Sequence, residues 1–114
     1  MNQAETVWVG YIIRDGKVKR FKWAMNLDIS PGGKLKAEGT ENSVGVMKLE
    51  GKVSHSKKRL VTGQDDFHFI KTFDDDEKKL HFQGKINLSG SCMRGVWGLN
   101  EKEEQGYFQA KQIS

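Results

Sequence analysis

The residues best equipped for acid–base or metal chemistry are few in this chain of 114 residues, and they are widely spaced. The three histidines, His55, His68 and His81, show no His-x-x-x-His spacing, and the single cysteine rules out the Cys-x-x-Cys pairs of zinc sites. The acidic run at 74–77 lacks the ligand spacing and the glycine of a calcium-binding EF-hand loop. No serine stands in a recognisable nucleophile motif. We therefore predict no catalytic residues, no metal site and no cofactor, which means a protein that is not an enzyme.

Two of the histidines share a feature that spacing alone does not show. His68 and His81 fall on the outward side of two consecutive predicted strands, so their rings are expected to approach each other. An incidental surface pair and a metal site both remain open interpretations of this arrangement.

Lys71 breaks a local rule, because it stands between Phe69 and Phe73 on the side of a strand that should face the core. A buried ammonium must be paired or lose its proton. Glu41 is the candidate counter-ion, because it continues the inward parity of Leu35, Ala37 and Gly39 at a strand end. One interpretation is a polar anchor in a ligand pocket, or a lysine of lowered pKa. Trp23 and Trp97 are the other candidate ligand-binding residues. The alternative is a lysine at a barrel mouth, its stem packed and its head in water.

The net charge of +4 is unevenly distributed along the chain. Residues 1–63 carry 12 basic and 6 acidic side chains, whereas residues 64–114 carry 7 and 9. Candidate protein-interaction residues are the charged clusters, which are Lys19, Arg20 and Lys22 on the basic side and Asp74, Asp75 and Asp76 on the acidic side. Such a dipolar surface orients a charged partner, although solvated strand faces and turn tips would look the same.

These residues must be positioned by strands, because glycines and large side chains recur at a spacing of two along the whole chain. The alternation is clearest from Phe21 to Ile29, and Asp15-Gly16 is a strong signal for a two-residue hairpin turn. Ser30-Pro31-Gly32-Gly33 predicts a type II turn with glycine at its third position. Residues 55–62 are expected to form a loop or an irregular hairpin end, and no segment shows a helical period. The predicted strands are 6–14, 18–29, 34–39, 44–53, 65–73, 79–88, 92–99 and 106–113, with a turn at 74–78.

Short connections make sequence neighbours into sheet neighbours, and pairing the first strand with the last would remove both open edges. We therefore predict an all-β fold, a single antiparallel up-and-down barrel of about eight strands over residues 6–114, after a short tail at 1–5. Gly39, Gly51, Gly84 and Gly95 are expected to permit coiling and to leave room for rings from across the barrel. The predicted interior set is Phe21, Trp23, Met25, Leu27, Leu35, Met47, Leu49, Val53, Phe67, Phe69, Phe73, Leu80, Phe82, Ile86, Met93, Trp97 and Phe108.

The pattern resembles the calycin superfamily, which includes lipocalins, fatty-acid-binding proteins and avidins. The residues that carry this resemblance are Trp8 and Gly10 in the first strand, followed by Gly45, Met47, Leu49, Gly51, Phe69, Lys71, Phe73, Gly84, Gly95, Trp97, Gly106 and Phe108. The departures concern function. Asp15-Gly16 leaves no space for the helix pair of fatty-acid-binding proteins, and Tyr11 to Ile13 stand where avidins place biotin-binding polar residues. The resemblance implies a fold and no ligand chemistry.

Three functions are compatible with these observations. The first is a non-enzymatic interaction module, a protein-binding or structural subunit of a larger intracellular assembly whose partners are other protein subunits. The second is a calycin-like binder of a small apolar or anionic ligand in the barrel interior. The third is single-stranded nucleic-acid binding, favoured by the basic first half and by outward Tyr11 and Tyr107. We expect no membrane span, because no apolar run approaches about 20 residues. The lack of a secretory signal predicts a cytoplasmic location by default.

Overall fold

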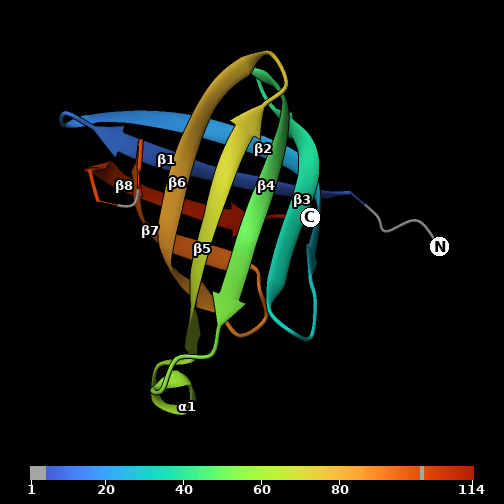
Figure 1. Ribbon diagram of the computed structural model, residues 1–114, viewed down its shortest axis with the longest axis vertical. Helices are drawn as coiled ribbons and strands as arrows, with labels where there is room; N and C mark the ends of the chain where they lie inside the picture. Colours follow the sequence, from blue (N-terminus) through green and yellow to red (C-terminus); the bar gives the residue numbers. More distant parts are fainter. Residues whose placement is uncertain (1–4, 101) are drawn as a thin grey trace.

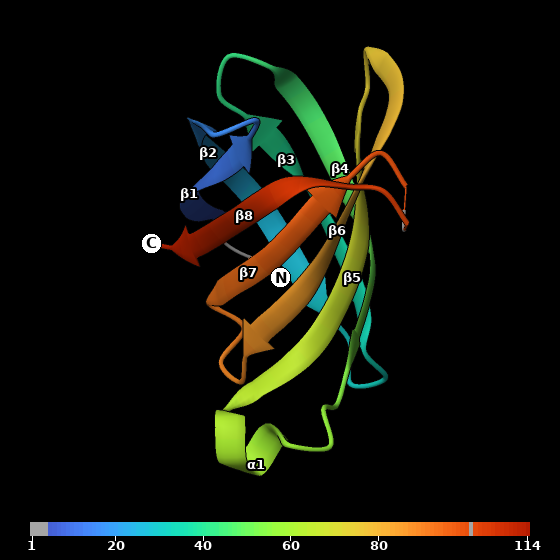
Figure 2. The ribbon, with the colours of Figure 1, turned by 90° about the vertical axis from the view of Figure 1, so that its left-hand side faces the viewer.

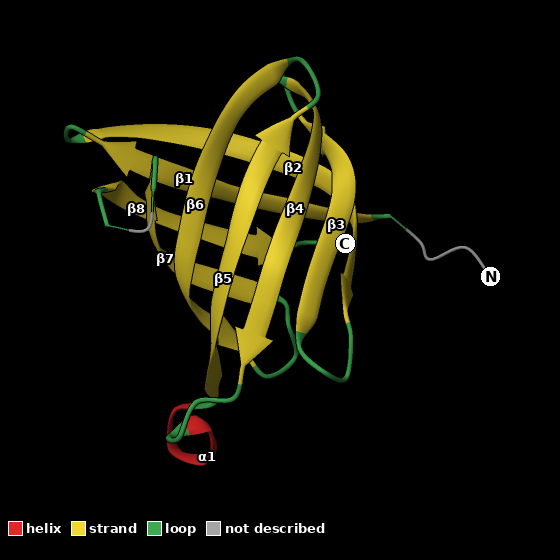
Figure 3. Cartoon of the chain, viewed as in Figure 1, coloured by secondary structure: helices red, strands yellow, loops and turns green. Residues whose placement is uncertain are grey.

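The alternating segments form eight antiparallel strands that close into one barrel (Figures 1 and 3). The computed structural model describes residues 5–100 and 102–114, so the predicted tail lies outside the described residues except for Glu5. The elements are β1 (Thr6–Arg14), β2 (Lys17–Ile29), β3 (Lys34–Glu41), β4 (Gly45–Ser54), α1 (Arg59–Thr62), β5 (Gln64–Phe73), β6 (Asp76–Asn87), β7 (Cys92–Gly98) and β8 (Glu104–Gln112).

Closure depends on β1, which pairs antiparallel with β2 on one side and with β8 on the other. Every other strand pairs with its sequence neighbours, so the predicted up-and-down order is confirmed. The barrel has two ends. The α1 end carries the β2–β3, β4–β5 and β6–β7 connections, and the far end carries the β1–β2, β3–β4, β5–β6 and β7–β8 turns (Figures 1 and 2).

Side chains fill the barrel interior. The predicted interior set lies inside, although Leu27, Val53, Phe73 and Leu80 are only partly buried. Trp8 is also fully buried, and its indole Nε1 donates a hydrogen bond to the Thr6 hydroxyl at 3.0 Å. The largest fully buried side chains are Trp8, Trp23, Phe69, Phe82, Phe108, Met25, Leu35, Met47, Leu49, Ile86 and Met93. Eight strands enclose just the width that side chains can occupy.

The four glycines singled out by the sequence, Gly39, Gly51, Gly84 and Gly95, lie in close contact with the backbone of a neighbouring strand. A Cβ atom added to Gly51 would lie 1.9 Å from the carbonyl oxygen of His68 and 2.5 Å from the Phe69 Cα atom on β5. Gly84 and Gly95 face each other across β6 and β7 for the same reason. Glycine is the residue that such a close approach of two strand backbones requires. Room for rings from across the barrel stays a prediction.

One of the predicted turns is confirmed and two others differ from prediction. Asp15 and Gly16 both have positive φ, as a two-residue I′ hairpin turn requires. At Ser30–Gly33 the positive φ falls on Gly33 and not on Gly32, so the turn is not the predicted type II turn. The β5–β6 turn is also shorter than predicted, because β6 already begins at Asp76.

One helical turn, α1, stands where a loop or an irregular hairpin end was predicted. It projects beyond the barrel wall between β4 and β5 (Figure 2). Gly63 ends it in the left-handed conformation, and the Gly63 N–H donates to the Arg59 carbonyl oxygen at 2.8 Å. A single turn is too short to show a hydrophobic period, which is why the sequence pattern missed it.

Candidate binding sites

The most unusual polar group lies inside the far half of the barrel. Lys71 on β5 is only 5% exposed, and its Nζ atom lies 2.7 Å from Oε1 of Glu41, the last residue of β3. The Trp23 indole Nε1 donates to the same oxygen at 2.7 Å. Glu41 was the predicted counter-ion, and the pairing is confirmed. The alternative of a lysine head in water is wrong, because the ammonium is buried.

Aromatic rings surround this ion pair. The Lys71 Nζ atom lies 5.2 Å from the ring centroid of Trp23, 5.0 Å from that of Phe73 and 5.3 Å from that of Phe82. Cation–π attraction to three rings and the ionic hydrogen bond both favour the charged form. Burial works against them and lowers the pKa of Lys71 below its usual 10.5, while Glu41 opposes that shift.

The three predicted ligand-binding residues, Lys71, Trp23 and Trp97, do not line one common pocket. Lys71 and Trp23 pack into the filled interior and line none of the cavities described below. Trp97 is bonded elsewhere, because its indole Nε1 donates to the Ile13 carbonyl oxygen at 3.3 Å. The arrangement of Lys71 and Glu41 fits a structural crosslink between β3 and β5.

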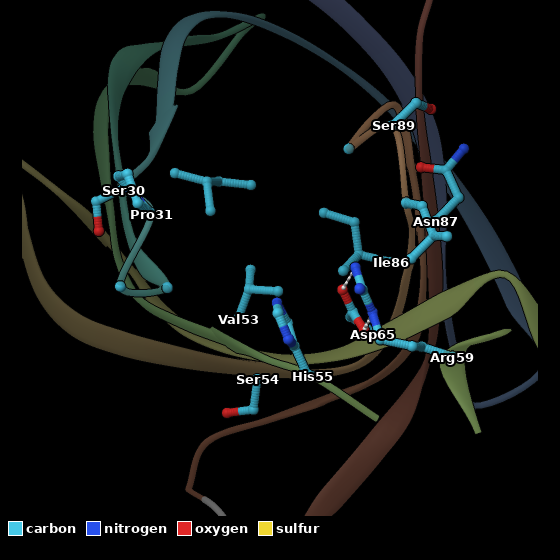
Figure 4. Close-up of a pocket in the computed structure, with 15 residues that line it drawn as sticks. Ser30, Pro31, Val53, Ser54, His55, Arg59, Asp65, Ile86, Asn87 and Ser89 are labelled. Atoms are coloured by element: carbon cyan, nitrogen blue, oxygen red, sulfur yellow. Dashed lines mark hydrogen bonds and ion pairs between the residues drawn. The ribbon is translucent and has the colours of Figure 1, made fainter. Parts of the chain in front are cut away.

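An open cup of about 600 Å³ lies at the α1 end of the barrel (Figure 4). Ser30 and Pro31 line one side, Asn87 and Ser89 lie across from them, and Val53 projects between the two sides (Figure 4). The cup therefore has an apolar centre and a polar rim built from three turns. A small amphipathic molecule or a side chain from a partner would match this lining.

One ion pair fixes the rim of the cup next to α1. The Arg59 guanidinium donates from Nε to Oδ1 of Asp65 at 3.0 Å and from Nη2 to Oδ2 at 3.2 Å. The backbone N–H of Ser56 donates to Oδ1 as well, at 3.2 Å. The hydrogen bond from Arg59 holds the pKa of Asp65 below its usual value. This bidentate pair ties α1 to the start of β5.

The basic cluster divides between two surfaces. Arg20 and Lys22 lie on the outer wall, whereas Lys19 has the inward parity of Phe21 and pairs in register with Ile12. Lys19 and Trp97 line a separate hollow of about 460 Å³ at the far end. A ligand site that includes Trp97 would therefore use Lys19 rather than Lys71.

The acidic cluster is at the far end as well. Asp74 and Asp75 are exposed at the β5–β6 turn, and the side chain of Asp76 lies outside the described part of the chain. The β1–β2 and β5–β6 turns are separate projections of the far end (Figure 1).

The two outward histidines approach each other as predicted, with ring centroids 5.7 Å apart. Among the side chains that the structure describes, no group of three or more histidine, cysteine, aspartate or glutamate residues is arranged to hold a metal ion. A pair of rings without a third ligand is insufficient for a structural zinc site, which takes four ligands.

Comparison with protein-family models, curated proteins and solved structures finds no match to this chain. Within the described residues, no helix has the length and apolar character needed to cross a membrane.

Sequence reasoning missed the cup and the Arg59–Asp65 pair. One signal was present, because Asp65 begins a strand on the inward parity of Phe67 and Phe69. A carboxylate on that parity needs a cation, just as Lys71 needs an anion. The partner cannot be identified from parity, because Arg59 lies outside the strands.

Proposed function

We propose that this protein is a non-enzymatic interaction module that joins other protein subunits in an intracellular assembly, with α1 as its docking element. The observation that carries this proposal is the exposure of two aliphatic side chains on α1, 91% for Leu60 and 89% for Val61. Isolated exposed aliphatic residues are common. Two neighbours fully presented on a projecting turn form a contact surface instead.

The turn that presents them is held in place by specific contacts. Arg59 binds Asp65 through two hydrogen bonds, and Gly63 closes the turn in the left-handed conformation. A docking element fixed before binding loses less conformational entropy when the partner arrives. The ion pair therefore supports binding by orienting Leu60 and Val61 outward.

The expected affinity contribution follows from burial. Full burial of one such side chain contributes about 1.5–3 kcal/mol, so the two together contribute about 3–6 kcal/mol. That range corresponds to roughly a 10²- to 10⁴-fold change in dissociation constant. Lys57 and Lys58 immediately precede Arg59, so the matching partner has an apolar groove bordered by carboxylates. The adjacent cup can receive a side chain of that partner.

A photocrosslinking amino acid at position 61 tests the proposal, with the same group at Val44 as the control. Val44 is 47% exposed at the far end of the barrel. The partner protein that is crosslinked from position 61 but not from position 44 is then purified. The affinity of this partner is measured for the parent chain and for Leu60→Ser/Val61→Ser. We expect the double variant to bind at least about 100-fold more weakly and Val44→Ser to bind like the parent.

Equal affinity of the parent and the double variant would refute α1 docking. Flotation with phosphatidylserine vesicles that depends on Leu60 and Val61 would also refute it, because the occupant would then be a membrane surface. Retained melting temperature in the double variant controls for folding, since both side chains are exposed.

The cup favours a second candidate function, which is a calycin-like barrel that binds a small amphipathic ligand. Its support is the apolar centre of the cup, Val53 and Ile86, beside the polar Arg59–Asp65 rim. The test is saturable binding of anilinonaphthalene sulfonate to the parent protein. We expect Ser89→Trp, which places a bulky ring on the rim, to abolish binding; unchanged binding would refute a ligand in the cup.

A further inference from the structure

A second surface, distinct from α1, lies on the outer wall of β1, β2, β7 and β8. Its centre is the tyrosine strip, defined by Tyr11, Ile13, Val96 and Tyr107. Ile13 and Val96 flank Tyr107 in register on its two sides, and Tyr11 lies on the diagonal next to it. Tyr107 is 65% exposed. The strip therefore presents aromatic rings to solvent on the outside of a closed barrel.

Cations border this strip in register. Arg20 pairs with Tyr11, while Lys22 and Lys111 flank Val9 on its two sides. Arg94 pairs with Gln109, which accepts a hydrogen bond from the Tyr11 hydroxyl at 3.0 Å.

These four cations have no carboxylate partner among the described residues, in contrast to Lys85, which forms an ion pair with Asp66. The outward positions of this wall hold no acidic residue from Val18 to Ala24 or from Cys92 to Val96, nor in the facing stretches of β1 and β8. The strip is thus bordered by positive charge that nothing on this wall neutralises.

Two hollows meet at the Tyr11–Gln109 pair. The first, of about 480 Å³, is lined by Arg20, Lys22 and Lys111, and the second, of about 520 Å³, is lined by Arg94 and Tyr107. Each hollow therefore combines a tyrosine ring with at least one unpaired cation. That combination is what a planar base with its phosphate requires.

We propose that the tyrosine strip and its four cations bind single-stranded nucleic acid. The cations span three strand spacings from β2 to β7, about 14 Å across the wall, which suits a short run of nucleotides rather than a long track. The outer wall of a barrel is convex and has no groove for a duplex, and ring stacking needs unpaired bases. An acidic peptide would satisfy the cations but would have no planar group for the hollows.

Fluorescence anisotropy with labelled oligonucleotides of ten thymidine or ten uridine residues tests this proposal, with the two oligomers separating DNA from RNA. We expect both to bind the parent protein, and Tyr107→Ala to weaken binding by about 5-fold or more because one stacked base is lost. Tyr107→Phe keeps the ring and is expected to retain parent affinity. A melting temperature equal to that of the parent confirms that Tyr107→Ala remains folded.

Salt dependence supplies the second readout. Four phosphate contacts predict a slope of about −2.8 in a plot of log affinity against log salt, and Arg94→Ala should reduce its magnitude by about 0.7. Lys36→Ala is the matched control, because Lys36 lies on β3 in register with Asp28 and Glu50. It removes the same charge and should leave the slope unchanged.

Three results would overturn the proposal. One is equal loss of affinity in Lys36→Ala and Arg94→Ala, which would indicate that the net charge of the protein attracts the oligonucleotide without a localised binding site. Another is parent affinity in Tyr107→Ala. The last is a deca-glutamate peptide that competes as well as the oligonucleotides, which would assign the strip to an acidic protein segment. None of these measurements involves Leu60 or Val61, so failure here leaves the α1 proposal standing.

Discussion

Replacement of Lys71 by methionine is expected to destabilise the barrel strongly. Methionine has a similar length and no charge, so it fills the same space between the rings of Trp23, Phe73 and Phe82. The change leaves the Glu41 carboxylate, 8% exposed, with only the Trp23 indole N–H as a hydrogen-bond donor among the described residues. A buried carboxylate that loses its cation is poorly solvated.

The expected loss of unfolding free energy in Lys71→Met follows from measurements on buried ion pairs in general. Removal of one partner costs about 3–5 kcal/mol. For a domain of this size, 1 kcal/mol corresponds to about 3–6 °C in melting temperature, so the melting temperature should fall by about 10–30 °C. Trp23 reports on the same cluster, which makes urea unfolding at pH 7 followed by tryptophan fluorescence a direct assay.

A second substitution, Glu41→Gln, tests whether the uncompensated charge of Glu41 causes the loss of stability. Glu41→Gln removes the charge but keeps an oxygen that can accept the Trp23 hydrogen bond. We expect Lys71→Met/Glu41→Gln to be about 2 kcal/mol more stable than Lys71→Met alone, because no uncompensated charge remains. The reasoning would be refuted if Lys71→Met matched the parent in free energy of unfolding at pH 7, or if the double variant were less stable than the single one.

The pKa of Lys71 adds a pH dependence with a definite sign. Burial lowers this pKa in the folded state, so the unfolded chain holds the proton more tightly. Stability attributable to Lys71 therefore rises with pH between its lowered folded pKa and the usual value of 10.5. The difference in unfolding free energy between the parent and Lys71→Met should increase over that interval. A flat or falling difference would contradict a lowered pKa.

Three further predictions concern other parts of the chain. Trp97→Ala should reduce the free energy of unfolding by about 3–5 kcal/mol through lost burial and a residual cavity, and a chain as stable as the parent would place that ring outside. Asp65 has a lowered pKa, so its contribution to stability is present above pH 3.8 and is lost as pH falls through the folded value. The unfolding free energy of Asp65→Asn should therefore fall less with decreasing pH than that of the parent. An equal fall in both proteins would contradict this prediction. Association with the protein partner should weaken from about 0.05 to 0.5 M salt, as the Debye length falls from roughly 14 to 4 Å. Reversal of Lys19, Arg20 and Lys22 to glutamate should slow that association with little effect on folding, and separate reversal of Lys19 identifies which surface acts; a parent-like rate in the triple variant at low salt would refute charge steering.

The barrel wall could be predicted because strand geometry is a local property. A period of two fixes which side chains share a face, so Phe21, Trp23 and Met25 point inward wherever the strand pairs. The same parity placed Lys71 inside, and the need to neutralise it identified Glu41. Trp8 was left out of the predicted interior, although its parity with Gly10 was available.

The candidate sites depended on residues that no local period connects. The register of β1 with β8 brings Tyr11 beside Tyr107 across most of the chain length, and only barrel closure sets that register.

The sequence by itself determined the eight strands, their inward faces and the need of Lys71 for a counter-ion, because alternation is local and a charge on an inward position needs a partner wherever that partner lies. Only the tertiary structure decided that α1 is an ordered turn, because the pairing of β4 with β5 fixes both ends of the segment in which Arg59 binds Asp65. It also decided that Lys19 shares one hollow with Trp97, because barrel closure brings those two strands together. Surfaces arise from how a closed sheet brings distant strands together, and that closure is a property of the whole chain.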